Sequence, residues 1–143
     1  RDEAKKRIFA WLYNPDSKDY LSSRAYDRDS VVQKYSTQGQ VTTFFGKVIP
    51  SESRTALNYI IQSTCAENVL RQMIKVSNYI QDKGLKSYVS FSVHDSIVID
   101  FSVEDKEHLK KIIDIFSETE LGKFLVNVSA GTDFGNLNDL EIT

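Results

Sequence analysis

The segment "YVSFSVHDSIVIDFS", residues 88–102, restricts the possible folds more than any other part of the chain. Its first half alternates Val89, Phe91 and Val93 with serines, which is the two-residue period of a β-strand. Its second half has apolar residues on both faces, so it needs cover from other elements; these residues are Ile97, Val98, Ile99 and Phe101. The segment therefore predicts an antiparallel β-hairpin packed against the rest of the protein.

Three polar residues, His94, Asp95 and Ser96, lie where this hairpin has to turn. Aspartate and serine favour tight turns, which is one explanation for them. A carboxylate among apolar strands costs free energy unless it is paired, hydrogen-bonded or bound to a metal. Asp95 is therefore also a candidate ligand for a divalent cation such as magnesium. These residues alone do not decide between the two explanations.

The remaining sequence predicts helices beside antiparallel strands, which is an α+β fold. Strong helix formers without glycine or proline predict the first helix, and Gly84 is expected to end the longest one. The expected helices are 1–13, about 24–35, 51–84 and 104–120, with a loop at 14–23, a small hairpin around Gly46 and a last strand at 124–131.

Composition narrows the class of protein. The formal net charge of −2 gives no overall basic character, although a local basic patch remains possible. The single cysteine, Cys65, excludes an internal disulfide and is typical of a reducing compartment. No apolar run is long enough to span a membrane. The first residue is Arg1 rather than methionine, so we expect the sequence to begin inside a longer protein.

Four residues spaced four apart, Arg1, Lys5, Phe9 and Tyr13, share one face of the first predicted helix, within an arc of roughly 120°. Two cations on one face can hold a polyphosphate, and an aromatic ring can stack on a sugar or base. The alternative, which the spacing alone favours, is that the cations are solvated while Phe9 and Tyr13 belong to the core.

A second row with the same spacing, Arg54, Asn58 and Gln62, is expected on the long helix within roughly 80°. All three side chains donate hydrogen bonds, so the row could contact the acceptors that every base pair presents in the minor groove. The alternative is an exposed polar face opposite the apolar residues Leu57 and Ile61.

These three sets of residues, in this order, resemble the motifs of the family A DNA polymerases, the class of bacterial DNA polymerase I and many phage replicases. The matching segments are "RDEAKKRIFAWLY", "RTALNYIIQST", "VHDSIVID" and the C-terminal "VSAGTDFGNL". The resemblance implies a fragment of the right-hand polymerase fold. Residues 1–35 would be a fingers segment, and residues 36–143 a palm portion with the catalytic hairpin at 88–102.

The resemblance also implies roles for the residues of the first helix. Arg1 and Lys5 match the cations that hold the phosphates of the incoming nucleotide. Lys5 matches the one nearest the reacting phosphate, and it is a candidate to protonate the leaving pyrophosphate. Phe9 matches the aromatic residue that packs on the nucleotide sugar, and Tyr13 the residue beside the templating base.

The other two motifs carry implied contacts with DNA and metal. Arg54, Asn58 and Gln62 match residues that contact primer–template near the growing end. Asp95 matches one of two metal-binding aspartates, and His94 its neighbour near the primer terminus.

Several positions depart from the family pattern. Ser96 stands where the palm motif commonly has glutamate, and Asn14 where a glycine usually follows the tyrosine. The connection from Tyr13 to Arg54 is shorter than in bacterial members, which is a phage-like feature. The motif of the first catalytic aspartate is absent. We therefore expect a C-terminal part of a polymerase, inactive alone, with an N-terminal remainder supplying the other aspartate.

The sequence thus predicts template-directed DNA synthesis, in which deoxynucleotides are added to a primer 3′ end with two Mg²⁺ ions, for which Mn²⁺ can substitute. The expected partners are primer–template DNA and deoxynucleoside triphosphates, in the cytoplasm of a bacterium or a phage-infected host and without a membrane. The alternatives are a non-catalytic nucleotide- or nucleic-acid-binding module and an α+β interaction domain.

Overall fold

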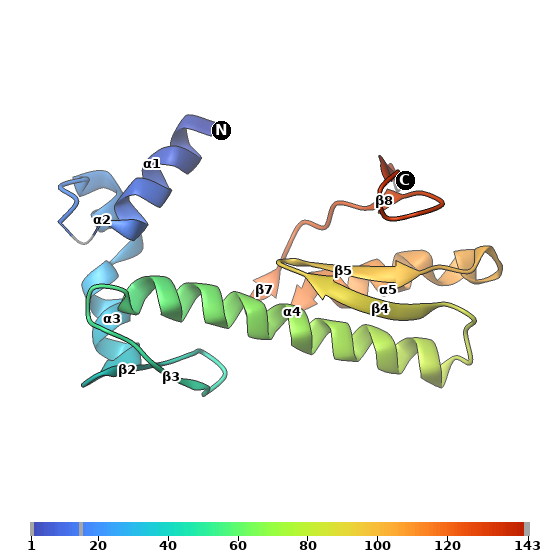
Figure 1. Cartoon of the computed structure of the whole chain (residues 1–143), viewed down its shortest axis with the longest axis horizontal. Helices are drawn as coiled ribbons and strands as arrows, with labels where there is room; N and C mark the ends of the chain where they lie inside the picture. The colour runs from blue at the N-terminus through green and yellow to red at the C-terminus, as the bar shows by residue number, and fades with distance from the viewer. Residues whose placement is uncertain (1, 15, 142–143) are drawn as a thin grey trace. The chain divides into compact units, whose positions relative to one another are not determined.

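The computed structural model describes residues 2–14 and 16–141 and contains two compact units, residues 1–67 and 68–143. The helix α4 (Ala56–Asp82) begins in the first unit and ends in the second (Figure 1). The structure is built from helices and small antiparallel sheets, which confirms the predicted α+β class. Among the described residues, no helix combines the length and the apolar character needed to cross a membrane.

The first unit combines helices with a small sheet. Its elements are α1 (Asp2–Tyr13), α2 (Tyr20–Tyr26), α3 (Arg28–Tyr35), β1 (Ser36–Thr37), β2 (Gln40–Thr42), β3 (Val48–Pro50) and the start of α4. The three strands pair antiparallel in the order β1-β2-β3. The buried residues Val41, Ala56 and Ile60 form the core, so the sheet packs on the start of α4.

The helix α1 and the β2–β3 hairpin are as expected, but three features of this unit were predicted wrongly. α2 begins at Tyr20, inside the expected loop, because Asp19 caps it by accepting a hydrogen bond from the Ser22 backbone N–H at 3.1 Å. Asp27, whose φ is 38°, separates α2 from α3, so the expected single helix is two. α4 begins at Ala56 rather than near residue 51, because residues 53–55 form turns.

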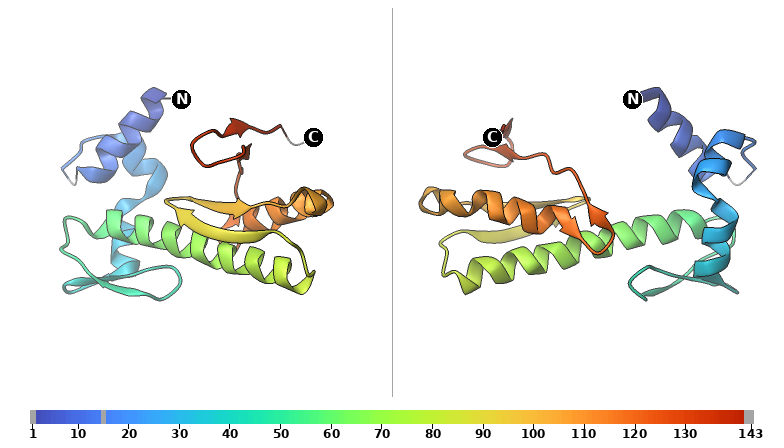
Figure 2. Two further views of the ribbon diagram at one scale, coloured as in Figure 1. Left: turned by 45° about the vertical axis from the view of Figure 1, so that its right-hand side comes forward. Right: turned by 180° about the vertical axis from the view of Figure 1, so that it is seen from behind.

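The second unit packs a hairpin against helices. Its elements are the end of α4, β4 (Tyr88–Val93), β5 (Ser96–Asp100), the 3-10 helix η1 (Val103–His108), α5 (Leu109–Ser117), β6 (Glu118–Thr119), β7 (Gly122–Lys123), β8 (Ser129–Ala130) and β9 (Asn138–Asp139). Val76, Ile80 and Ile112 form its buried core, and β4 and β5 cover them with Val89, Ile97 and Ile99. Figure 2 shows the end of α4 and the helix α5 running along the hairpin.

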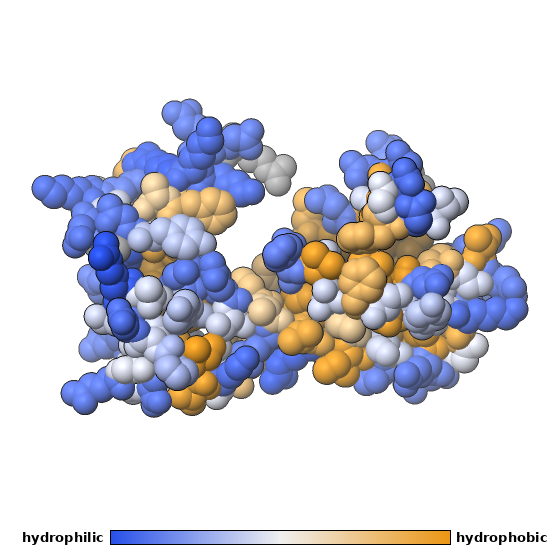
Figure 3. Space-filling model, viewed as in Figure 1, coloured by the Kyte–Doolittle hydropathy of each residue, from blue (hydrophilic) through white to orange (hydrophobic). Residues whose placement is uncertain are grey.

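The predicted hairpin is confirmed, with one irregularity. Pairing shifts between Val89 and Phe91, which is a β-bulge, so these two residues do not share a face as simple alternation predicted. Val89 packs on the core, whereas Phe91 is exposed and meets Phe134 edge-to-face at 5.6 Å between ring centres. Exposed apolar residues therefore contribute to the surface of this unit, part of which Figure 3 shows.

Two other predicted elements, the helix 104–120 and the strand 124–131, are shorter in the structure than expected. The region 104–120 begins as the 3-10 helix η1, and the α-helical part is limited to α5. The expected strand 124–131 is reduced to β8, which pairs with β9. Leu125 is 88% exposed, and no strand pairs with residues 124–128 among the described residues, so their apolar sequence forms no ladder. The expected end of α4 is confirmed, since Gly84 follows with φ 62°.

Gln72 joins α4 to the end of α5. Its side chain is 1% exposed, and its amide nitrogen donates to the backbone carbonyls of Ile115 and, at 2.6 Å, of Glu118. The last carbonyls of a helix have no partner within the helix, so Gln72 supplies donors that α5 lacks.

Gln72→Leu is expected to lower the free energy of unfolding by about 1–3 kcal/mol, because similar bulk remains while two carbonyls lose their donor. Urea unfolding followed by circular dichroism measures the loss. Gln81→Leu, at an exposed position of the same helix, is the matched control and should change stability by less than about 0.5 kcal/mol. Equal effects of both variants would contradict the assigned role of Gln72.

Asp105 closes the open end of the hairpin. Its buried carboxylate accepts hydrogen bonds from the Ser87 hydroxyl at 2.6 Å and the Ser87 N–H at 2.7 Å. The Ser87 oxygen in turn accepts from the Ser102 N–H at 2.9 Å. The hydrogen bond from the Ser87 hydroxyl is the main reason that the pKa of Asp105 is lowered.

A lowered folded-state pKa means that Asp105 stabilises the fold above its unfolded pKa of about 3.9, and that this stabilisation is lost as the pH falls further. Asp105→Asn is therefore expected to lower the melting temperature at pH 7 and to flatten its decline below about pH 4. Melting curves recorded from pH 7 to pH 3 check this. Parallel pH profiles for the variant and the wild type would contradict it.

Candidate functional site

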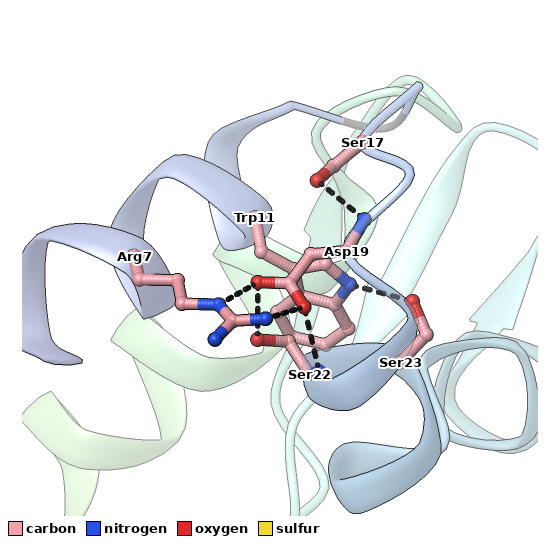
Figure 4. A network of polar contacts seen from close by, with 6 residues as sticks. All are labelled: Arg7, Trp11, Ser17, Asp19, Ser22 and Ser23. Carbon is pink, nitrogen blue, oxygen red and sulfur yellow. Dashed lines mark hydrogen bonds and ion pairs between the residues drawn. The ribbon is translucent and has the colours of Figure 1, made fainter.

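One face of α1 fixes the helix to the rest of its unit. Arg7 forms two charged hydrogen bonds to Asp19, one of them 2.7 Å long, and Trp11 donates from Nε1 to the Ser23 hydroxyl at 2.9 Å (Figure 4). Trp11 is 3% exposed. The bond from Arg7 is the main cause that lowers the pKa of Asp19. Sequence reasoning missed this anchor, although Arg7 and Trp11 are four residues apart on one face.

Arg28 of α3 holds the end of the same helix. Its guanidinium donates to the backbone carbonyls of Trp11 at 2.9 Å and Leu12 at 3.3 Å. The guanidinium carbon also lies 4.9 Å from the centre of the Trp11 ring. α1 is thus fixed through the face that carries Arg7 and Trp11, and its opposite face carries Lys5, Phe9 and Tyr13.

The exposed face of α1 carries three of the four residues of the first predicted row. Lys5 Nζ lies 5.7 Å from the Phe9 ring centre, and the Phe9 and Tyr13 rings are 6.3 Å apart. Phe9 is 45% and Tyr13 56% exposed, so the alternative that both belong to the core is wrong. Arg1 lies outside the described residues.

The second row only partly follows the predicted helix face. Asn58 and Gln62 lie one turn apart on α4, but Arg54 lies in the turn before it, because the helix begins at Ala56. Gln62 Nε2 donates to the Tyr13 hydroxyl at 2.9 Å, which brings the first and second rows together.

Asn58 has an unusual environment. Its Oδ1 atom is buried and has no hydrogen-bond partner among the described residues. An unsatisfied buried acceptor costs about 1–3 kcal/mol, and such a group asks for an explanation. One explanation is that Asn58 is retained to bind a ligand rather than to stabilise the fold.

The hairpin tip consists of a two-residue turn, His94 and Asp95, between the paired residues Val93 and Ser96. His94 has φ 52°, a region that non-glycine residues rarely adopt and that is over-represented at functional sites. The Ser96 hydroxyl donates to the Val93 carbonyl at 2.8 Å, so this departure from the family pattern closes the turn.

Asp95 is exposed, and its carboxylate has no hydrogen bond or ion pair within the described part of the chain. The burial cost that suggested metal binding is therefore absent, although the carboxylate is available to a ligand. Residues 2–14 and 16–141 hold no group of three or more potential metal ligands. Asp100 is engaged elsewhere, since Tyr88 donates to it at 2.8 Å. Asp95 thus fits one ligand of a shared metal site but cannot hold two ions alone.

Comparisons with known proteins agree on one family. The model of DNA polymerase family A matches residues 17–137, which include Arg54, Asn58, Gln62, His94 and Asp95 but not α1. DNA polymerase I of Borreliella burgdorferi is 32% identical over 88 residues, 59% of this chain and 10% of that protein. DNA polymerase I of Bacillus subtilis is 31% identical over 111 residues, 66% of this chain and 12% of that protein.

A phage protein and a solved structure are also similar. The DNA polymerase of Bacillus phage SP01 is 34% identical over 80 residues, 52% of this chain and 9% of that protein. The POL domain of Pol1 from M. smegmatis, solved in complex with DNA primer-template and dNTP, covers 81% of this chain with a TM-score of 0.56. It is 23% identical, so it shows the fold alone, and the match covers 22% of that chain.

The chain spans about a tenth of the length of the curated relatives it matches. The family model, in contrast, covers most of this chain. The chain therefore belongs to DNA polymerase family A.

Proposed function

We propose that this chain contributes nucleotide- and DNA-binding surfaces and one metal-binding carboxylate to a template-directed DNA polymerase. The observation that carries the proposal is the exposed face of α1, where Lys5, Phe9 and Tyr13 follow one another and Gln62 is bonded to Tyr13. Two exposed aromatic rings and a cation on a helix fixed from behind suit a flat, anionic ligand. Membership of the family supports the same function.

The incoming nucleotide would bind along α1. Lys5, with Arg1 as its partner, would hold the triphosphate, because an ammonium and a guanidinium attract phosphate oxygens. Phe9 would pack on the sugar and Tyr13 would stand beside the templating base. We assign residues 1–35 to a fingers segment on this basis.

Primer–template would bind along the start of α4. Gln62 and Asn58 carry amides that can donate to minor-groove acceptors, and the guanidinium of Arg54 can add a contact from the preceding turn. We assign residues 36–143, including the hairpin at 88–102, to the palm. His94 would lie near the primer terminus.

Asp95 would be one ligand of two Mg²⁺ ions, for which Mn²⁺ could substitute. Bound there, the ions would activate the primer hydroxyl and neutralise charge on the phosphates. A second carboxylate has to come from a further part of the polymerase, so residues 1–143 alone should not extend primers. The single cysteine supports a reducing compartment, and we propose the cytoplasm of a bacterium or a phage-infected host.

Primer extension by the complete polymerase that contains this sequence tests the proposal. With magnesium, a primer–template and all four deoxynucleotides, the purified protein should copy the template strand. Binding of DNA or nucleotide without extension would instead favour the non-catalytic binding module.

Phe9→Tyr tests the position of the ring directly. A phenylalanine beside the nucleotide sugar cannot replace a missing 3′-hydroxyl, whereas a tyrosine hydroxyl can donate to a nearby phosphate oxygen. A hydrogen bond to a charged group is worth about 1.5–3 kcal/mol, so dideoxynucleotide use relative to deoxynucleotide should rise roughly 10- to 100-fold. Competition between the two substrates in primer extension measures the ratio. An unchanged ratio would mean that Phe9 does not face the sugar.

A further inference from the structure

The hydrogen bond between Gln62 and Tyr13 connects two rows that the proposed function assigns to different ligands. It joins residues 49 positions apart in sequence, on α1 and α4, with a distance of 2.9 Å between Nε2 and the hydroxyl. Both side chains are exposed and both belong to the first unit. The bond therefore lies where bound molecules can reach it.

Other contacts also hold α1 in place. Arg7, Trp11 and Arg28 already fix the helix through its other face. The bond acts on the Tyr13 ring, which lies beside the Phe9 ring on α1 at an angle of 51° between the ring planes. Its main consequence is therefore the direction in which the exposed Tyr13 side chain points.

The Gln62 amide has capacity for a second partner. Its nitrogen carries two hydrogens and its oxygen accepts hydrogen bonds, so one hydrogen can go to Tyr13 while the other meets an acceptor in a minor groove. We propose that Gln62 is a positioning residue that couples seating of the primer–template to the orientation of Tyr13. This inference rests on the proposed function, since it needs both DNA beside Gln62 and a templating base beside Tyr13.

Three substitutions separate the two contacts of Gln62. Gln62→Ala removes both, and Tyr13→Phe removes the bond while keeping the ring. Gln62→Glu loses the amide donors, including the one that a minor-groove acceptor requires, but its carboxylate can accept a hydrogen bond from the Tyr13 hydroxyl, so the bond can re-form with its direction reversed. The glutamate variant should therefore preserve the orientation of Tyr13 and weaken only the contact with DNA.

Single-nucleotide addition by the complete polymerase provides two readouts, the Kd for primer–template and the efficiency ratio of correct to incorrect nucleotides. Gln62→Ala should weaken DNA binding and lower the ratio, each by about three- to tenfold. Tyr13→Phe should lower the ratio similarly with little change in Kd. Gln62→Glu should weaken binding and leave the ratio near that of the wild type.

The double variant with Gln62→Ala and Tyr13→Phe decides whether the effects are coupled. Its ratio should be no lower than that of either single variant, because each removes the same bond. Asn58→Ala is the matched control, which should weaken DNA binding without lowering the ratio. Effects that multiply in the double variant, or a ratio in Gln62→Glu or Asn58→Ala as low as in Gln62→Ala, would overturn the coupling alone. Failure of the wild type to extend a primer would refute the proposed function as well.

Discussion

Asp95→Asn in the complete polymerase is expected to reduce primer extension by about three orders of magnitude, while the fold remains intact. Asparagine keeps the shape of the side chain but lacks the negative charge that divalent ions require, and metal-ion stabilisation of a reacting phosphate is worth several kcal/mol. The fold should tolerate the change because Asp95 is exposed in a two-residue turn, where asparagine is also favoured. Single-turnover extension at saturating magnesium measures the rate.

Asp100→Asn is the control for this prediction. Asp100 lies at the other end of the same hairpin, where it accepts a hydrogen bond from Tyr88, so its loss should leave extension within a few-fold of the wild type. Similar losses in both variants would point to damage to the hairpin rather than to a metal site. Asp95→Asn extending primers at nearly the wild-type rate would remove Asp95 from the catalytic centre.

The parts of the fold that sequence predicted well are those with a local period. Alternation in residues 88–93 and the apolar run after the turn predicted the hairpin, and helix formers without a breaker predicted α1. The bulge between Val89 and Phe91 could not be predicted, because it depends on which residues of the partner strand pair with them. The prediction of a strand at residues 124–128 was wrong for a similar reason, because an apolar segment forms a strand only when another strand pairs with it.

The boundaries around α2 and α3 depended on single side chains. Asp19 both caps α2 and pairs with Arg7, and Asp27 adopts a positive φ that its residue type allows but does not require. Neither the cap at Asp19 nor the positive φ of Asp27 produces a periodic pattern in the sequence. The same holds for Arg54, which four-residue spacing placed on a helix that in fact begins after it.

For the candidate site, the spacing of residues could predict only which side chains share a helix face. Spacing placed Lys5, Phe9 and Tyr13 on one face, but it could not say whether that face was buried, and the structure shows Phe9 and Tyr13 exposed. The bond from Gln62 to Tyr13 spans 49 residues, so no local pattern could indicate it. Tertiary structure alone therefore revealed that the two rows meet.

Lys5→Ala is expected to lower the turnover number of the complete polymerase by about 100- to 1,000-fold, with a smaller change in the KM for nucleotide. A charge aimed at the reacting phosphate acts mainly in the transition state, and loss of one such group typically costs that much. Arg1→Ala, if Arg1 holds phosphates away from the reacting one, should instead mainly raise KM. Steady-state and single-turnover kinetics separate the two parameters.

Lys6→Ala is the matched control for Lys5, because it removes the same charge from the adjacent residue, about 100° away around α1. Alanine is the best helix former, so neither substitution should unfold the exposed helix. A general loss of positive charge would slow both variants equally through weaker attraction of DNA and nucleotide, and raising the salt concentration would remove the difference from the wild type. A loss confined to Lys5 and insensitive to salt would instead require a fixed contact with the reacting phosphate, which is the role proposed for Lys5 on the face of α1 that it shares with Phe9 and Tyr13.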